Sequence, residues 1–112
     1  MTGTFLAEFE LYVMLAAAGL RDGAYGAAMR QEIEERTGRP VSIGALYATL
    51  GRLEEKGLVE REAEDPEPGQ RGRPRKYCRL TPAGEEAVRH STEKLRRMME
   101  GASWLTRPAE GQ

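Results

Sequence analysis

The chain has 112 residues, a formal net charge of −1, one cysteine and one histidine. This length suits one domain with a core, and is too short for both a deep cavity and a second domain. The lone Cys78 excludes an internal disulfide and a cysteine-based metal cluster. Because the chain as a whole is not basic, any affinity for nucleic acid must come from local clusters of positive charge.

The first predicted element is a helix over residues 5–20. Its apolar residues form two stripes at helical spacing, Phe5, Phe9, Tyr12 and Ala16 on one and Leu6, Val13 and Leu20 on the other. A helix that is apolar on two sides usually has two partners. We therefore expect one side to pack within its own domain and the other to meet a second subunit.

A second helix is predicted from Tyr25 to Arg36, with Gly38 as its C-terminal cap. The connection that follows contains Val41, a candidate for a one-residue strand pairing. A third helix then runs over residues 43–56, because Ser42 can accept a free backbone N–H of its first turn. Its buried stripe is predicted to be Ile43, Leu46, Leu50 and Leu53, which recur at steps of three and four.

The opposite face of this third helix is predicted to point outward. At 100° per residue it carries Gly44, Ala48, Gly51, Arg52 and Glu55, with Tyr47 and Thr49 on its flanks. Small side chains in the first two turns let a helix lie close in the major groove of DNA, where Tyr47, Thr49 and Arg52 can bond to phosphates or base edges. An ordinary surface helix without a ligand explains the same pattern, so both interpretations stay open at this point.

Two short strands are predicted at residues 58–59 and 77–80, joined by a proline- and glycine-rich segment over residues 65–74. This arrangement predicts a hairpin with a long tip. The side before the tip is acidic, with Glu60, Glu62, Glu64, Asp65 and Glu67 against Arg61 alone. Because an acid beside a DNA phosphate is repelled, we expect this side to face away from DNA.

The tip ends in the basic run Arg71-Gly72-Arg73-Pro74-Arg75-Lys76. It carries four positive charges and no acid, and its glycine and proline keep the chain extended. Extended Arg-Gly-Arg-Pro is also the core of the minor-groove motif called an AT-hook, because arginine is attracted by the negative potential of a narrow groove. A solvated basic loop is the alternative, but the position beside a candidate recognition helix favours DNA.

The last helix is predicted to begin after Thr81, an N-cap residue, with Pro82 at its first position, and to continue to about Trp104. Two apolar series at seven-residue spacing are Val88, Leu95 and Ala102, and Met98 and Leu105. This repeat is adequate for a contact between two helices, so we expect a homodimer. Its predicted interface residues are Phe5, Phe9, Val88, Leu95, Met98 and Met99.

The order helix, helix, helix, hairpin, long helix is typical of a winged helix-turn-helix. We predict a fold that is mainly α with a small β-hairpin: a DNA-binding domain over residues 1–80, a C-terminal dimerisation helix over 81–105 and a flexible tail over 106–112. No signal peptide pattern is visible, and the longest apolar-rich stretch is too short to span a bilayer. We therefore expect a cytoplasmic protein without a membrane partner.

The sequence resembles the PadR family of transcriptional regulators. Residues 44–59 resemble that family's recognition helix and first strand, residues 72–84 its wing and the start of its last helix, and Tyr25-Gly26 the start of its second helix. The match covers about residues 5–100 in order. The resemblance implies a homodimeric repressor of the short branch, with a single C-terminal helix that crosses the partner.

The resemblance also implies roles for individual residues. Tyr47 and Arg52 match the recognition-helix motif, and Tyr25 matches a helix N-terminus that can meet a phosphate. The predicted DNA-contacting residues are Tyr25, Ser42, Gly44, Tyr47, Ala48, Thr49, Arg52, Arg71, Arg73, Arg75 and Lys76. Some short-branch members bind flat apolar drugs between the subunits through an aromatic residue midway along the last helix. The equivalent place here is near Leu95, more than two turns before Trp104. We therefore interpret Trp104 as a residue that packs in the dimer or is partly exposed.

Three classes of function remain after the sequence alone. The first is a repressor that binds double-stranded DNA at an inverted repeat, the second a dimer that senses a small-molecule effector, and the third a helical protein-interaction module. An enzyme is not expected, because no paired acid and base, nucleophile set or phosphate loop is visible, and no cofactor or metal is expected. Cys78 is interpreted as a strand residue and not a redox sensor, since no second cysteine can resolve it.

Overall fold

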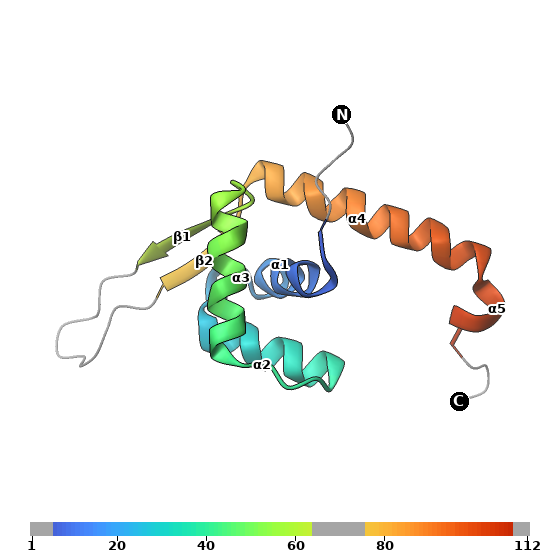
Figure 1. Cartoon of the computed structure of the whole chain (residues 1–112), viewed down its shortest axis with the longest axis horizontal. Coiled ribbons are helices and arrows are strands. Elements are labelled where there is room, and N and C mark those ends of the chain that lie inside the picture. Colours follow the sequence, from blue (N-terminus) through green and yellow to red (C-terminus); the bar gives the residue numbers. More distant parts are fainter. Residues whose placement is uncertain (1–5, 64–75, 109–112) are drawn as a thin grey trace.

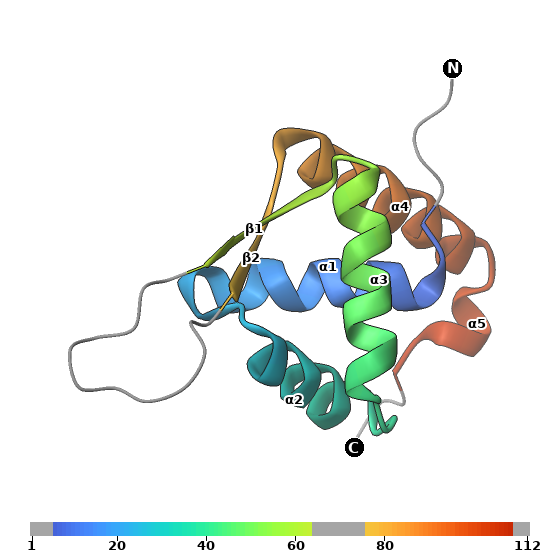
Figure 2. The same ribbon diagram turned by 60° about the vertical axis from the view of Figure 1, so that its left-hand side comes forward.

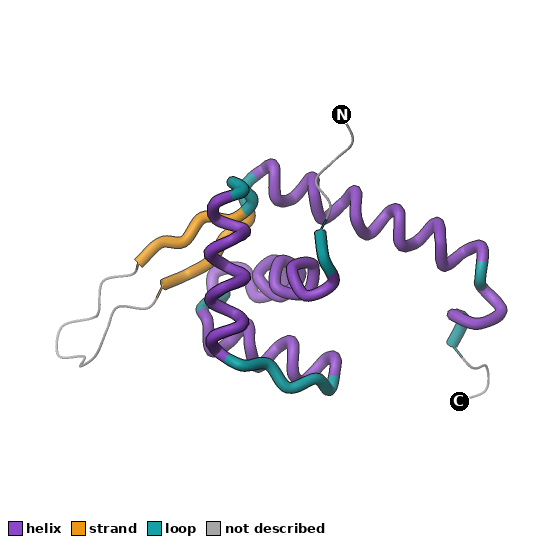
Figure 3. The backbone as a smooth tube through the Cα atoms, viewed as in Figure 1, coloured by secondary structure: helices purple, strands orange, loops and turns teal. Residues whose placement is uncertain are grey.

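The computed structural model describes residues 6–63 and 76–108. Its elements in chain order are α1 (Glu8–Leu20), the short 3-10 helix η1 (Arg21–Gly23), α2 (Gly26–Thr37), α3 (Ile43–Glu55), β1 (Val59–Ala63), β2 (Lys76–Leu80), α4 (Pro82–Gly101) and α5 (Ser103–Thr106). The predicted fold class is confirmed, since helices predominate and the two strands form one antiparallel hairpin (Figures 1 and 3).

The core lies where α1, α2 and α3 meet, and Figure 2 shows α3 crossing α1. Its most deeply buried apolar side chains include Val13, Met14, Met29, Leu46, Leu50 and Leu53. The three leucines recur at steps of four and three, which places them on one face of α3. Packing this face against the core leaves the opposite face of α3 on the surface.

The prediction that Ile43 belongs to this buried stripe is wrong, because 44% of the residue is exposed. Ile43 lies at the edge of the stripe on the helical wheel and is the first residue of α3. No preceding helical turn is present there to help cover it. The exposed isoleucine therefore belongs to the surface of the helix-turn-helix and not to its core.

The predicted helix caps are confirmed. The hydroxyl of Ser42 accepts the backbone N–H of Ala45 at 3.1 Å, and that of Thr81 accepts the N–H of Gly84 at 3.0 Å. Gly38 ends α2 with φ at 71°, in the left-handed region that glycine adopts without steric cost. These caps supply partners for backbone groups that have none inside the helix.

The hairpin is attached to the body through β2. Val59 faces Leu80 and Ala63 faces Lys76 in the antiparallel register. The strand pairing predicted at Val41 is wrong: the isolated bridge joins Tyr25 to Tyr77. The backbone N–H of Val41 instead donates to the carboxylate of Glu34 at 2.8 Å, which occupies the donor that a strand partner would need.

The last helix leaves the body of the molecule. Only Gly84 and Ala87 of α4 are buried, and from Lys94 onward its residues are exposed (Figure 1). The prediction of one helix to about Trp104 is wrong, because α4 ends at Gly101 and Ala102 leaves the helical conformation before α5. Glycine is a poor helix former and a common residue at helix ends, which accounts for the break.

Candidate nucleic-acid interface

The outward face of α3 is a surface of small residues. Gly44, Ala45 and Ala48 are exposed in its first two turns, and Arg52 is exposed one turn later. None of the first three carries a polar side-chain atom. The backbone of α3 can therefore come close to a surface with room for a helix, such as the major groove of DNA.

Tyr47 stands beside this surface and is half exposed. Its ring lies against Gly26, the first residue of α2, so closely that a Cβ atom there would overlap the phenol hydroxyl. With a larger residue at this position, the end of the Tyr47 side chain would have to move. Gly26 thus lets the ring of Tyr47 pack against the start of α2.

The predicted place of Thr49 on the flank of the exposed face is wrong, because its side chain is buried. It is only 1% exposed, because it lies beside Leu53 at the margin of the leucine stripe, on the side that the core covers. Its hydroxyl accepts a hydrogen bond from Nη2 of Arg52 at 3.0 Å. Thr49 therefore orients the guanidinium of Arg52, which remains exposed at the surface.

Tyr25 connects the start of α2 to the wing. It is the N-cap residue of α2, and its ring meets that of Tyr77 edge to face, with 5.9 Å between the ring centroids. The first N–H groups of a helix attract anions such as phosphate. Tyr25 is half buried and lies at this end of α2, and its contact with a phosphate stays a prediction.

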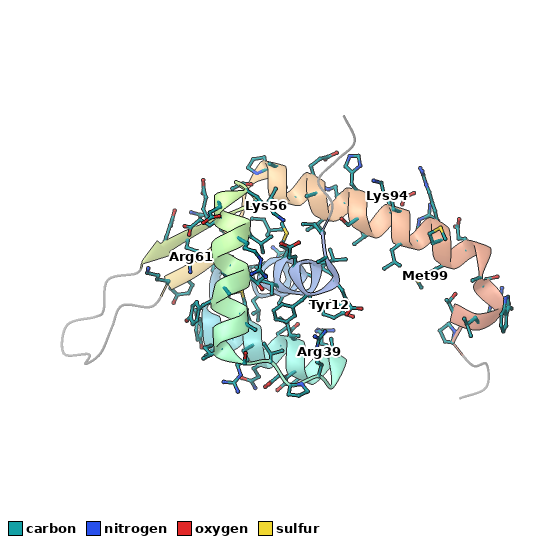
Figure 4. All side chains as sticks on the ribbon, viewed as in Figure 1. Tyr12, Arg39, Lys56, Arg61, Lys94 and Met99 are labelled. Atoms are coloured by element: carbon teal, nitrogen blue, oxygen red, sulfur yellow. The ribbon has the colours of Figure 1, made fainter. Side chains whose placement is uncertain are left out.

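The wing brings its charges into pairs. On β1, Arg61 donates to the carboxylate of Glu54 in α3 at 2.8 Å, and Glu62 accepts from Arg79 on β2. Lys76, the first residue of β2, is exposed. Arg71, Arg73 and Arg75 lie outside the described residues, as does Phe5 of the predicted dimer interface. The Arg61–Glu54 pair ties the wing to α3, and Figure 4 shows Arg61 beside that helix.

Glu10 is a buried acid that the sequence pattern did not single out. It is 7% exposed, and its carboxylate accepts the N–H of Ala7 and the ammonium of Lys56, each at 3.0 Å. Burial alone would raise the pKa of Glu10, but these two donors outweigh it and the pKa is lowered. Its position at N3 of a helix that starts with a small residue is the signal that could have revealed it.

Cys78 is a structural residue in this arrangement. It is buried on β2, and burial raises the pKa of its thiol to about 11. A protonated thiol is a poor nucleophile, which agrees with the interpretation of Cys78 as a strand residue.

A groove of about 840 Å³ lies between the end of α1, strand β2 and the start of α4. Its walls are partly apolar, as at Ala17 and Val88, and partly charged, as at Arg21 and Arg89. Neither Leu95 nor Trp104 lines it.

In the described part of the chain, no helix has the length and apolar content needed to cross a membrane.

Comparison with known proteins gives a consistent assignment. The model of the family described as "Transcriptional regulator PadR-like family" matches residues 14–90. The transcriptional regulator Rv3488 of Mycobacterium tuberculosis is 38% identical over 98 residues, which cover 85% of each protein. A PadR family transcriptional regulator from Eggerthella lenta has a crystal structure that matches with a TM-score of 0.66 at 30% identity, over 90% of this chain and 89% of that one.

One relative is much longer than this chain. An uncharacterised 37.1 kDa protein in the transposon Tn4556 of Streptomyces fradiae is 38% identical over 86 residues, which are 76% of this chain and 23% of that protein. The family match itself spans more than half of the chain and includes α2, α3, the wing and the start of α4. This chain therefore belongs to the PadR family of winged-helix, DNA-binding transcriptional regulators.

Proposed function

We propose that this chain acts as a homodimeric repressor that binds an inverted-repeat operator in double-stranded DNA. In this proposal the recognition helix α3 enters the major groove and the basic wing contacts the backbone or the minor groove. The observation that carries it is the surface of Gly44, Ala45 and Ala48, which is exposed and free of polar side-chain atoms, with Tyr47 and Arg52 at its margins.

The proposed dimer contact is the apolar side of the extended part of α4. Leu95 is 53% exposed and Met98 75%, and Met99 is also exposed. Val88 and Phe9 are half buried, so part of each remains available to a partner. Exposed apolar groups that gather on one side of a helix are typical of an interaction site. A second copy of this chain is the partner that the family resemblance favours.

Two-fold symmetry determines the form of the operator. A symmetric dimer presents two recognition helices, which meet half-sites separated by about one turn of DNA. Repression follows in this proposal from occupancy of a promoter by the dimer. A dimer that senses a small-molecule effector is the second candidate function, and the α1–β2–α4 groove is the observation that favours it.

The substitution Ala48→Glu tests the docking face. Ala48 is exposed at the centre of the outward face of α3, so glutamate leaves the leucine core untouched and brings a negative charge against the phosphates. We expect loss of operator binding in a mobility-shift assay with an unchanged melting temperature.

Ala83→Glu is the matched control, because Ala83 is equally an exposed helical alanine but lies in the first turn of α4. It introduces the same charge on α4 and not on the outward face of α3, and we expect it to bind like the wild type. Normal binding by Ala48→Glu would show that α3 does not dock in this way.

A further inference from the structure

The start of α3 presents aliphatic carbon where a recognition helix meets bases. Ile43 is 44% exposed, and its exposed neighbours Gly44, Ala45 and Ala48 add no polar side-chain atom. The hydroxyl of Ser42, which precedes them, is engaged as the cap of the helix. The leading end of α3 is therefore an apolar surface in a protein whose family binds a highly charged ligand.

The polar side chains of α3 are held at a distance from this end. The hydroxyl of Tyr47 is directed toward Gly26 of α2. Arg52 lies more than two turns after Ile43, and its guanidinium is hydrogen-bonded to Thr49. The first three residues of α3 have no side-chain atom that can form a hydrogen bond. Apolar contact is therefore the means by which their side chains can distinguish one base from another.

The place of Ile43 also separates it from the proposed dimer contact. Figures 1 and 2 both show the start of α3 beside α2 and its C-terminal end near the start of α4. The exposed apolar part of α4 begins well beyond that point. A second copy that packs on α4 therefore leaves Ile43 free for DNA.

We propose that Ile43 is a specificity-determining residue that contacts the C5-methyl group of thymine in the major groove. Thymine is the one base that presents a methyl group there, and N-terminal residues of a recognition helix are those that reach base edges. The inference rests on the proposed docking of α3 and adds to it the class of base that the first turn selects.

The test uses the full chain and a binding site selected from random-sequence duplex DNA. Each thymine of the selected site is then replaced in turn by deoxyuridine, which lacks only the methyl group. We expect that replacing one particular thymine, in either half-site alone, weakens binding about fourfold, which is the effect of removing one buried methyl-sized group. Replacing this thymine in both half-sites of the same DNA should weaken binding about 15-fold.

The variant Ile43→Ala identifies the residue responsible. It should bind the thymine and deoxyuridine sites alike, whereas Ile43→Val, which keeps branched methyl groups, should retain most of the difference. Because Ile43 is half exposed, both variants should melt near the wild-type temperature. An unchanged deoxyuridine effect in Ile43→Ala, or no effect at any thymine in the wild type, would overturn the role of Ile43.

Ala48→Glu separates this inference from the proposal on which it rests. If Ala48→Glu binds the selected site normally, the docking of α3 is wrong and the role of Ile43 is wrong with it. If Ala48→Glu fails to bind while deoxyuridine sites bind the wild type as tightly as thymine sites, α3 docks and only the thymine contact is overturned.

Discussion

Gly84 shows how one residue can position an element. It lies in the first turn of α4, where a Cβ atom would overlap the carbonyl oxygen of Leu58. The same carbonyl accepts the N–H of Thr81 at 3.1 Å, and the hydroxyl of Thr81 donates to the carbonyl of Gly57 at 2.7 Å. The start of α4 is thus fixed against the junction of α3 and β1.

Gly84→Ala should destabilise the fold. The added Cβ would overlap a backbone carbonyl, which cannot turn away as a side chain can. The start of α4 would therefore have to move, and the free energy of unfolding should fall by about 2–3 kcal/mol. Gly101→Ala is the control in the same helix, because nothing lies near its added Cβ, and it should stabilise by up to about 1 kcal/mol. Chemical denaturation of both variants measures the difference, and equal stabilities would contradict this account of Gly84.

The Glu10–Lys56 pair predicts a pH dependence. Because the pKa of Glu10 is lowered in the fold, its contribution to stability is present above the ordinary carboxyl value of 4.5 and is lost as the pH falls through the lowered pKa. Glu10→Gln keeps an oxygen for Ala7 but removes the charge opposite Lys56. We expect Glu10→Gln to lower the free energy of unfolding by about 1 kcal/mol at neutral pH.

The control for this pair is Glu8→Gln, since Glu8 meets Arg39 at the surface at 3.5 Å. It should change stability little at any pH. A difference between wild type and Glu10→Gln that persists unchanged to strongly acid pH would mean that the Glu10 charge is not the cause.

At the scale of elements, α4 is an amphipathic helix whose polar side is paired within itself. Glu93 accepts from Arg96 at 2.7 Å and from Arg97 at 3.3 Å, and His90 lies 3.0 Å from Glu86. Pairs at these spacings support an isolated helix, which explains how α4 can extend beyond the body. Its other side carries exposed Leu95 and Met98 without such partners among the described residues.

Leu95→Glu should weaken the proposed dimer. A charge in an apolar contact between two helices loses buried surface and its own hydration, so sedimentation should show monomer at micromolar concentrations where the wild type is dimeric. Arg97→Gln changes the net charge by the same amount on the opposite side of α4 and should leave the dimer intact. A compact wild-type monomer at these concentrations would refute the dimer.

The wing has its own expected effect on binding. Replacing Arg73 and Arg75 together by alanine removes two cations from the basic run. If both meet phosphates, the slope of log affinity against log salt should fall in magnitude by roughly two, with weaker binding to operator and random DNA alike. Loss of operator preference with an unchanged salt slope would instead indicate base contacts by these arginines.

At the scale of the whole molecule, the two proposed functional surfaces belong to different parts. DNA contact belongs to the α2–α3 and wing side, and dimer contact to the extended part of α4 (Figure 1). Footprinting of the dimer should therefore show two symmetric protected half-sites about one helical turn apart. A single asymmetric footprint would contradict the two-fold arrangement.

The sequence by itself determined the elements and most of their boundaries. Local chemistry is sufficient there, because a cap such as Ser42, a left-handed glycine such as Gly38 and a leucine stripe act within a few residues. The outward small-residue face of α3 followed from the same periodicity. The motifs at Tyr25-Gly26, in α3 and in the wing were also sufficient to identify the family.

Tertiary structure alone decided which residues of those patterns are covered. Thr49 and Ile43 both lie at the margins of the leucine stripe, yet the core covers Thr49 and leaves Ile43 exposed at the helix start. Glu10 finds Lys56 across 46 residues of sequence, and Tyr25 rather than Val41 meets the wing. Periodicity specifies the direction of a side chain from its own helix, whereas burial depends on what another segment places there.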